Sequence, residues 1–145
     1  MSLELPEELI SIEMLSKLFK STSFEPEISE KGDLYVPGTQ SEIIVKVTDT
    51  DEQKFITFIT YKPFRPEISK ESRLEWINEL NSDNLMVRFS IMGDKHLYCD
   101  YQFSFQDGIL AESILNTFRR FDYVVGALFY PPIRERQVML AAETD

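Results

Sequence analysis

The strongest constraint on this 145-residue chain is a stretch of alternating residues between Leu85 and Phe105. Apolar side chains occupy every second position of two runs, on either side of a turn at Gly93-Asp94-Lys95. A period of two puts alternate side chains on opposite faces of a strand, and a short loop with glycine joins antiparallel neighbours. These residues therefore predict a β-hairpin with one face in the protein core. The apolar positions are Leu85, Val87, Phe89 and Ile91 in the first run, and Leu97, Cys99, Tyr101, Phe103 and Phe105 in the second.

A short helix is predicted directly before this hairpin. Its apolar face comprises Leu74, Ile77 and Leu80, with Trp76 on the flank. Ser69 is positioned as its N-cap. The polar run Asn81–Asn84 favours a stop, because these side chains compete with the backbone for hydrogen bonds. We expect one of Asn78 and Asn81 to cap the helix end and the other to fix the turn into the next strand.

The first helix is expected from Pro6 to about Lys20, and its apolar residues form two rows. Proline is tolerated in the first turn, and Glu7 and Glu8 are favourable near a helix N-terminus. A surface helix needs only one apolar stripe. Either other elements of the same chain cover both rows, or the second row meets another chain. The first row is Leu5, Leu9, Ile12, Leu15 and Phe19, and the second is Ile10, Met14 and Leu18.

Two pairs of strands are predicted between the first two helices. Ser23–Val36 is typical of two short strands around a glycine turn, and Ser41–Thr48 pairs with Lys54–Tyr61 across an acidic loop. Large apolar side chains occupy both faces of the Lys54–Tyr61 strand. Either this strand is central and covered on both sides, or Ile56 and Phe58 help to form a contact surface.

The last helix follows Gly108 and has one clear apolar face. Pro131-Pro132 ends it, and residues 133–145 form either a short further helix or a loose tail. Because no linker or repeat divides the chain, we predict a single domain over residues 1–145. The order of helix, three or four strands, helix, two strands and helix indicates an α+β fold, with helices packed on one side of a mostly antiparallel sheet. The apolar positions of the last helix are Leu110, Ile114, Phe118, Phe121, Val125 and Leu128.

The net charge limits the classes of partner. With 25 acidic and 15 basic residues the chain carries a net charge of −10, so phosphate backbones and anionic membrane surfaces repel it. No uncharged run approaches the ~20 apolar residues that span a bilayer. The acidic start of the chain differs from the basic start of a signal peptide, and a lone cysteine excludes an internal disulfide. We therefore expect a cytoplasmic protein that binds no nucleic acid and does not insert into membranes.

Residues suited to catalysis or metal binding are sparse. His96 and Asp100 share a strand face, but successive positions on that face are ~7 Å apart, too far for a hydrogen bond. Cys99 points into the core, where a thiol acts as a small apolar group. The acidic loop that begins at Asp49 lacks the glycine of a calcium-binding loop. We expect no enzyme activity, no cofactor and no metal site.

The helix residues Leu74–Asn81, LEWINELN, followed by Val87-Arg88-Phe89, resemble the YbjN family. The resemblance extends over about residues 9–129 and includes the aromatic return strand to Phe105. Members are small bacterial proteins described as regulators of sensory transduction. The resemblance implies a fold similar to class I type III secretion chaperones, which are small, acidic, usually dimeric proteins that bind unfolded protein segments. It implies a protein-binding role and supplies no catalytic residues.

The sequence therefore predicts a non-enzymatic protein-binding module with a chaperone-like or regulatory role, and a homodimer is the expected assembly. A partner segment would pair with an exposed sheet edge or lie across an apolar groove. The predicted contact residues are Ile10, Met14, Ile56 and Phe58. The alternative is a sensor or carrier of a small ligand, with an aromatic pocket between sheet and helix. That pocket would be lined by Phe89, Tyr101, Phe103 and Phe118.

Overall fold

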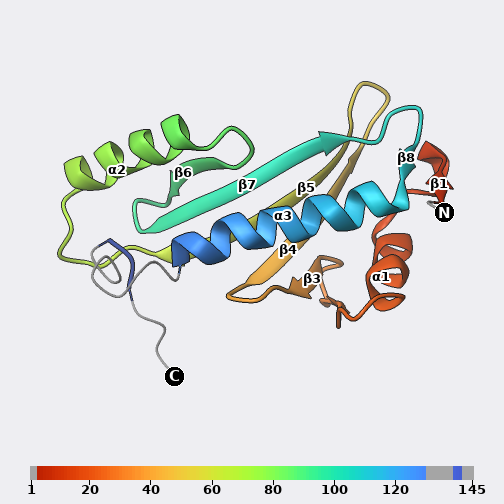
Figure 1. The fold of residues 1–145 in the computed structure, drawn as a ribbon, viewed down its shortest axis with the longest axis horizontal. Coiled ribbons are helices and arrows are strands. Elements are labelled where there is room, and N and C mark those ends of the chain that lie inside the picture. Colours follow the sequence, from red (N-terminus) through yellow and green to blue (C-terminus); the bar gives the residue numbers. More distant parts are fainter. Residues whose placement is uncertain (1–2, 130–138, 142–145) are drawn as a thin grey trace.

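The structure is a computed structural model that describes residues 3–129 and 139–141. Its centre is a six-stranded antiparallel sheet in the order β2-β3-β4-β5-β7-β6 (Figure 1). The return strand of the last hairpin, β7, therefore lies inside the sheet, and β6 lies at its edge. The strands are β2 (Glu27–Ile28), β3 (Leu34–Pro37), β4 (Glu42–Asp49), β5 (Lys54–Pro63), β6 (Arg88–Met92) and β7 (His96–Ser104).

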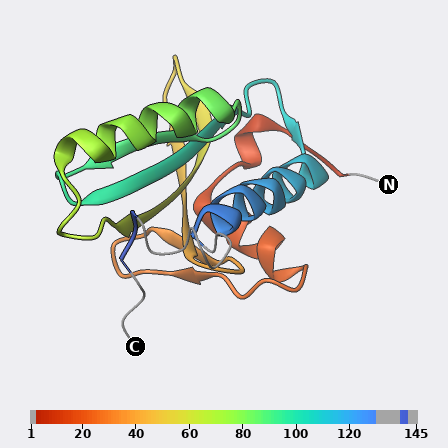
Figure 2. The same cartoon turned by 60° about the vertical axis from the view of Figure 1, so that its left-hand side comes forward.

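Three helices, α1 (Ile12–Lys20), α2 (Lys70–Asp83) and α3 (Ala111–Phe129), pack on one face of this sheet. Phe118 of α3 contacts Phe58 of β5, with ring centroids 5.4 Å apart, and Phe19 of α1 at 4.9 Å. Trp76 of α2 contacts Phe64 just beyond β5 at 6.2 Å. Figures 1 and 2 show α3 running along the sheet and α2 beside β6 and β7. The predicted α+β class, with helices on one side of an antiparallel sheet, is confirmed.

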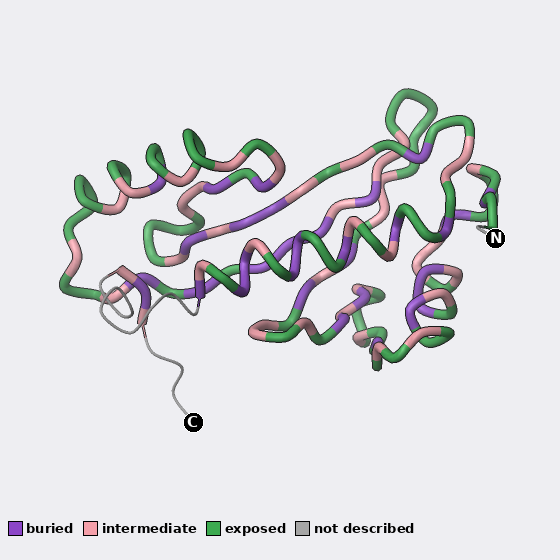
Figure 3. Tube along the Cα trace, in the orientation of Figure 1, coloured by how far each residue is buried: buried purple, intermediate pink, exposed green. Residues whose placement is uncertain are grey.

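Burial follows the strand periodicity. Leu97 and Cys99 of β7 are fully buried, as are Val45 of β4 and Phe58 of β5. Figure 3 shows buried positions recurring along β5, β7 and α3, whereas α2 is buried only at Ile77. The alternating pattern of the sequence thus predicts the core face of the sheet.

The first helix differs from its prediction. Glu7–Leu9 form a short 3-10 turn, Ile10 is extended, and α1 begins only at Ile12. The reason is Ser11, whose Oγ accepts a hydrogen bond from the backbone N–H of Met14 at 3.1 Å and so caps the helix. The predicted start at Pro6 is therefore wrong by about two turns.

Two strand and helix boundaries are also corrected. Leu85 is fully exposed and precedes β6, because the Asn84 side chain donates to the Leu80 carbonyl at 2.9 Å and holds the chain at the end of α2. Leu110 belongs to β8 (Ile109–Leu110), which pairs with β1 (Glu4–Leu5) in a separate two-stranded sheet. Neither of these two-residue strands has a periodic pattern from which it could be predicted.

A buried aspartate ties α3 to the loop between β3 and β4. The Asp122 carboxylate accepts hydrogen bonds from the Thr39 backbone N–H at 2.9 and 3.1 Å and from the Thr39 hydroxyl at 3.2 Å. Gly38 lies so close that an added Cβ would be 2.4 Å from a carboxylate oxygen of Asp122. Only glycine therefore allows this approach of loop and helix.

Residues 139–141 return to the sheet. Leu140 forms an antiparallel bridge with Phe64 and is 7% exposed. The predicted helix end at Pro131-Pro132 lies outside the described residues, as does most of the predicted tail over 133–145. The single domain over residues 1–145 stays a prediction.

Candidate protein-contact surface

Three of the four predicted contact residues lie inside the core. Ile10 is 3% exposed, and Ile56 and Phe58 have no exposed surface, whereas Met14 is half-buried. The cause is the strand order: β5 lies between β4 and β7, and its Ile56/Phe58 face is the face that the helices cover. A contact through these three side chains would require the core to open, so we place the candidate surface elsewhere.

The opposite face of β4, β5, β7 and β6 is covered by none of the described helices. The pairing register aligns its side chains in rows, of which Ile44, Ile59, Asp100 and Arg88 form one. We call this surface the open face. It consists of Glu42, Ile44, Lys46 and Thr48 from β4; Phe55, Thr57, Ile59, Tyr61 and Pro63 from β5; His96, Tyr98, Asp100, Gln102 and Ser104 from β7; and Arg88, Ser90 and Met92 from β6.

A salt bridge organises the charged part of the open face. Arg88 Nε lies 3.0 Å from Asp100 Oδ1, and one Nη lies 2.6 Å from Oδ2. This two-pronged geometry is the strongest that an arginine and a carboxylate form. The Asp100 side chain is only 8% exposed, whereas that of Arg88 is 74% exposed. The hydrogen bond to Asp100 and the carboxylate charge raise the pKa of Arg88.

The same salt bridge removes the basis for an acid–base pair. Both oxygens of Asp100 are engaged by Arg88, while the His96 ring lies edge-on to Tyr61 with centroids 5.5 Å apart. On the other side of the sheet, Cys99 is fully buried, and burial raises the pKa of its thiol. Neither the histidine nor the cysteine is arranged as a nucleophile with its base.

Two tyrosines lie side by side in the uncharged part of the open face. Tyr61 is 46% exposed, and Met92 at the sheet edge is 37% exposed. Tyr98 is half-buried between Tyr61 and Ser90; its pKa is raised by burial first and by the charge of Asp100 second. Exposed tyrosine and methionine with few charges resemble the composition of protein interfaces.

Both edges of the sheet are blunted. At β6, the Asn81 side chain accepts from the Phe89 N–H at 2.9 Å and donates to the Phe89 carbonyl at 3.0 Å, so α2 blocks this edge at Phe89. At the other edge, β2 has only two residues and follows Pro26. Of Asn78 and Asn81, one was expected to cap the helix end and the other to fix the turn; Asn81 bonds across the turn to Phe89, whereas the cap at the helix end comes from Asn84.

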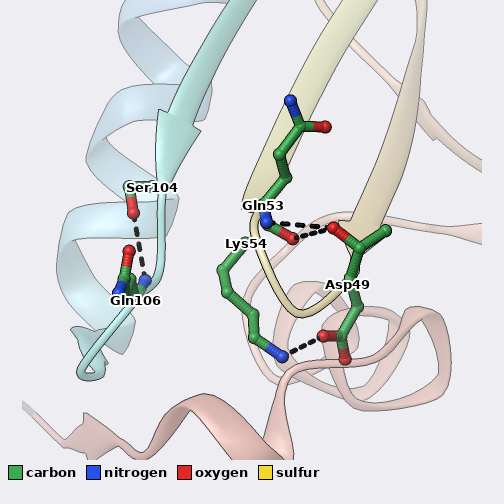
Figure 4. A network of polar contacts seen from close by, with 6 residues as sticks. Asp49, Gln53, Lys54, Ser104 and Gln106 are labelled. Carbon is green, nitrogen blue, oxygen red and sulfur yellow. Dashed lines mark hydrogen bonds and ion pairs between the residues drawn. The ribbon is translucent and has the colours of Figure 1, made fainter.

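The acidic loop between β4 and β5 is the predicted hairpin loop. Figure 4 shows Lys54 paired with Asp49 across its base, while the Thr50 side chain accepts a hydrogen bond from Gln53 N–H at 2.9 Å. The hydrogen bond to Asp49 raises the pKa of Lys54. Among the described residues, no group of three His, Cys, Asp or Glu side chains is arranged to hold a metal ion.

The residues of the aromatic pocket alternative are packed against one another and their neighbours. Phe118 is in ring contact with Phe19, Phe24 and Phe58 at 4.9 to 5.4 Å, and Tyr101 stacks on Phe103 at 5.8 Å. Such distances are those of close-packed rings.

No described helix is long and apolar enough to cross a bilayer.

Comparison with known proteins identifies the family. The model of the YbjN family, described as "Putative bacterial sensory transduction regulator", matches residues 11–129. Among solved structures, the fold is similar to that of "YbjN, a putative transcription regulator from E. coli", with a TM-score of 0.70 and 13% sequence identity over 92% of this chain and 97% of that one. No match was found among curated proteins. Because the family model spans well over half of its residues, this chain belongs to the YbjN family.

Proposed function

We propose that the protein is a non-enzymatic regulatory module that binds another protein chain through the open face. The proposal includes a homodimer as the basic assembly and the cytoplasm as its location. The observation that carries it is the difference in charge between this face and the rest of the molecule. Lys46 and Arg88 offset Glu42 and Asp100, so the open face has no net charge, on a chain whose net charge is −10.

The extent of the open face supports this role. At about 3.3 Å per residue and about 4.8 Å between strands, the residues of these four strands present about 500 Å². A stable protein interface needs about 800 Å² from each partner. The face is therefore large enough to form most of an interface, and its low charge lets another acidic chain approach without strong repulsion.

A protein partner also fits the family description better than direct contact with DNA. Regulation of transcription or of sensory transduction works through proteins as well as through nucleic acid, and a net charge of −10 opposes binding to phosphates. The resemblance of the family to dimeric secretion chaperones supports the homodimer. No observation favours the small-ligand sensor, because the rings of its pocket already pack against one another.

The test uses two tyrosines as a matched pair. Tyr61 lies on the open face, whereas Tyr123 is 76% exposed on α3, on the other side of the sheet. Each is replaced in turn by a photoreactive phenylalanine analogue in the full chain, and living cells are irradiated. Because both replacements keep an aromatic ring, neither should disturb folding.

We expect adducts from position 61 and none from position 123. An adduct of twice 17.0 kDa would identify the second copy in a homodimer, and any other mass would identify a different protein. If position 123 crosslinks as strongly as position 61, or position 61 gives no adduct, the open face is not the contact surface.

A further inference from the structure

Strand β5 extends beyond its neighbour β4. The two strands pair only as far as Ile44 and Ile59, whereas β5 continues to Pro63 and pairs with β7 over that additional length. Beyond Pro63, Phe64 N–H still donates to the Lys95 carbonyl on the β7 side at 2.9 Å. The other side of Pro63–Arg65 therefore faces away from β7 and is not paired by β4. We call this backbone edge the β5 step.

Residues 139–141 occupy the β5 step. Arg65 N–H donates to the Met139 carbonyl, and Ala141 N–H donates to the Pro63 carbonyl, both at 2.9 Å. Between these two hydrogen bonds Leu140 bridges to Phe64, and its side chain is buried in the core cluster at 7% exposure. The contact thus has the form of a strand added to a sheet edge.

Side chains from α2 hold the β5 step in place. Phe64 is 3% exposed, with Trp76 at 6.2 Å on one side and the Arg73 guanidinium 4.9 Å from its ring centroid. The same guanidinium donates to the Arg65 carbonyl at 3.1 Å and to the Asp94 carbonyl at 2.6 Å. Arg73 therefore links α2 to the backbone of the β5 step.

We infer that the β5 step is a docking site for an extended segment of another protein that carries one aliphatic side chain, and that residues 139–141 occupy it in cis until such a segment displaces them. The inference rests on the proposed protein-binding role and deepens it, since it specifies the kind of partner segment and a means of regulation. The crosslinking test at Tyr61 involves neither Leu140 nor the β5 step. Either proposal can therefore fail while the other stands.

The nature of the contact makes exchange possible. Both hydrogen bonds use backbone groups, which every extended segment possesses, so only Leu140 contributes a side chain that a competitor must match. The described contact is three residues long, shorter than β4, β5, β6 and β7, which have between 5 and 10 residues. Nine residues separate Met139 from Phe129, the last described residue of α3, so the segment competes as a ligand that belongs to the same chain.

A fluorescent peptide of the sequence Gln137–Glu143 serves as the probe, and its binding to full-length protein is measured by anisotropy. Two variants are designed to release the docked segment: Leu140→Asp removes the apolar contact, and Ala141→Pro removes the N–H that donates to Pro63. Leu140→Met keeps both and is the matched control. A second peptide with aspartate in place of its leucine tests the need for the aliphatic side chain.

We expect both released variants to bind the probe at least about tenfold more tightly than the wild type or Leu140→Met, since a site filled in nine molecules of ten has its apparent affinity reduced tenfold. The aspartate peptide should not bind. Equal binding to all four proteins, or no binding to released variants that remain folded by circular dichroism, would overturn the inference. If both released variants unfold, residues 139–141 belong to the permanent core and the inference is also wrong.

Discussion

Replacing Asn81 with alanine tests how the edge of the sheet is closed. The Asn81 side chain makes two hydrogen bonds to the backbone of Phe89, at 2.9 and 3.0 Å. A hydrogen bond of this kind contributes about 0.5–1.5 kcal/mol net. Phe89 is 3% exposed, but Asn81 itself is exposed, so water reaches part of the space that alanine leaves. We therefore expect the free energy of unfolding to fall by about 1–2 kcal/mol, rather than by the larger loss of a fully buried pair.

A matched control is available on the same helix. Alanine has a higher helix propensity than asparagine by up to about 0.7 kcal/mol, which offsets part of the loss. Asn78 is exposed one turn earlier in α2, so Asn78→Ala gains the same propensity without touching β6. The difference between the two variants in urea unfolding measures the hydrogen bonds alone.

In thermal unfolding the difference should be roughly 2–4 °C for each kcal/mol. Asn81→Ala should also self-associate more than Asn78→Ala in light scattering, because the freed Phe89 groups invite pairing at the edge. If the two variants unfold at the same urea concentration, Asn81 does not stabilise the edge and our account of its closure is wrong.

Three further predictions concern buried polar groups. Asp122→Ala should lower the free energy of unfolding by about 1–3 kcal/mol in urea titrations, because Thr39 loses the acceptor for its N–H and hydroxyl. Arg88→Leu should destabilise more than the double variant Arg88→Leu/Asp100→Leu, because the single change leaves a buried carboxylate without its cation. Cys99 should resist thiol reagents at pH 8 until urea is added. Burial raises the pKa of the Cys99 thiol in the folded state above the unfolded value of roughly 8.5. Above that pH only the unfolded state loses the proton, and this stabilises the unfolded state. The wild type should therefore lose more stability at alkaline pH than Cys99→Ala, and equal pH profiles of urea midpoints would contradict this.

Local patterns predicted those parts of the fold that local physics determines. The period of two in β4, β6 and β7 marked the buried face, and the Ser69 hydroxyl caps α2 by accepting from Ser72 N–H at 3.1 Å. The first helix was mispredicted because two N-terminal signals compete there, Pro6 with its glutamates and Ser11. The serine cap determines the start, because its side chain reaches the free N–H of Met14.

The order of the strands in the sheet cannot be predicted from local sequence patterns, and the position of the candidate surface depends on that order. Periodicity shows that Ile56 and Phe58 share one face of β5, but it does not show which face the helices cover. That is decided by the pairing of β5 with β7, which are more than thirty residues apart in sequence. Tyr61, on the other face, was therefore not recognised.

One feature of the site was readable from the sequence. A three-residue loop at 93–95 pairs Met92 with His96, and counting back along both strands places Arg88 opposite Asp100. An arginine facing an aspartate across a hairpin indicates a salt bridge. The docking of Leu140 has no such signal, because the segment has no period, and its partner Phe64 is 76 residues away.

The two proposed contacts would have different roles in a regulator: the open face would hold the partner, and the β5 step would respond to it. The open face is built on paired strands, and its charged groups are fixed by the Arg88–Asp100 salt bridge, so it offers one constant surface. The β5 step offers two states, occupied in cis or open, and an equilibrium can be shifted only by a ligand that prefers one state over the other. A partner that contacts only the open face binds both states equally and shifts nothing. A partner that also places an aliphatic residue against Phe64 binds the released state alone. Any signal carried by this protein should therefore depend on Leu140, whereas the presence of the partner should depend on Tyr61.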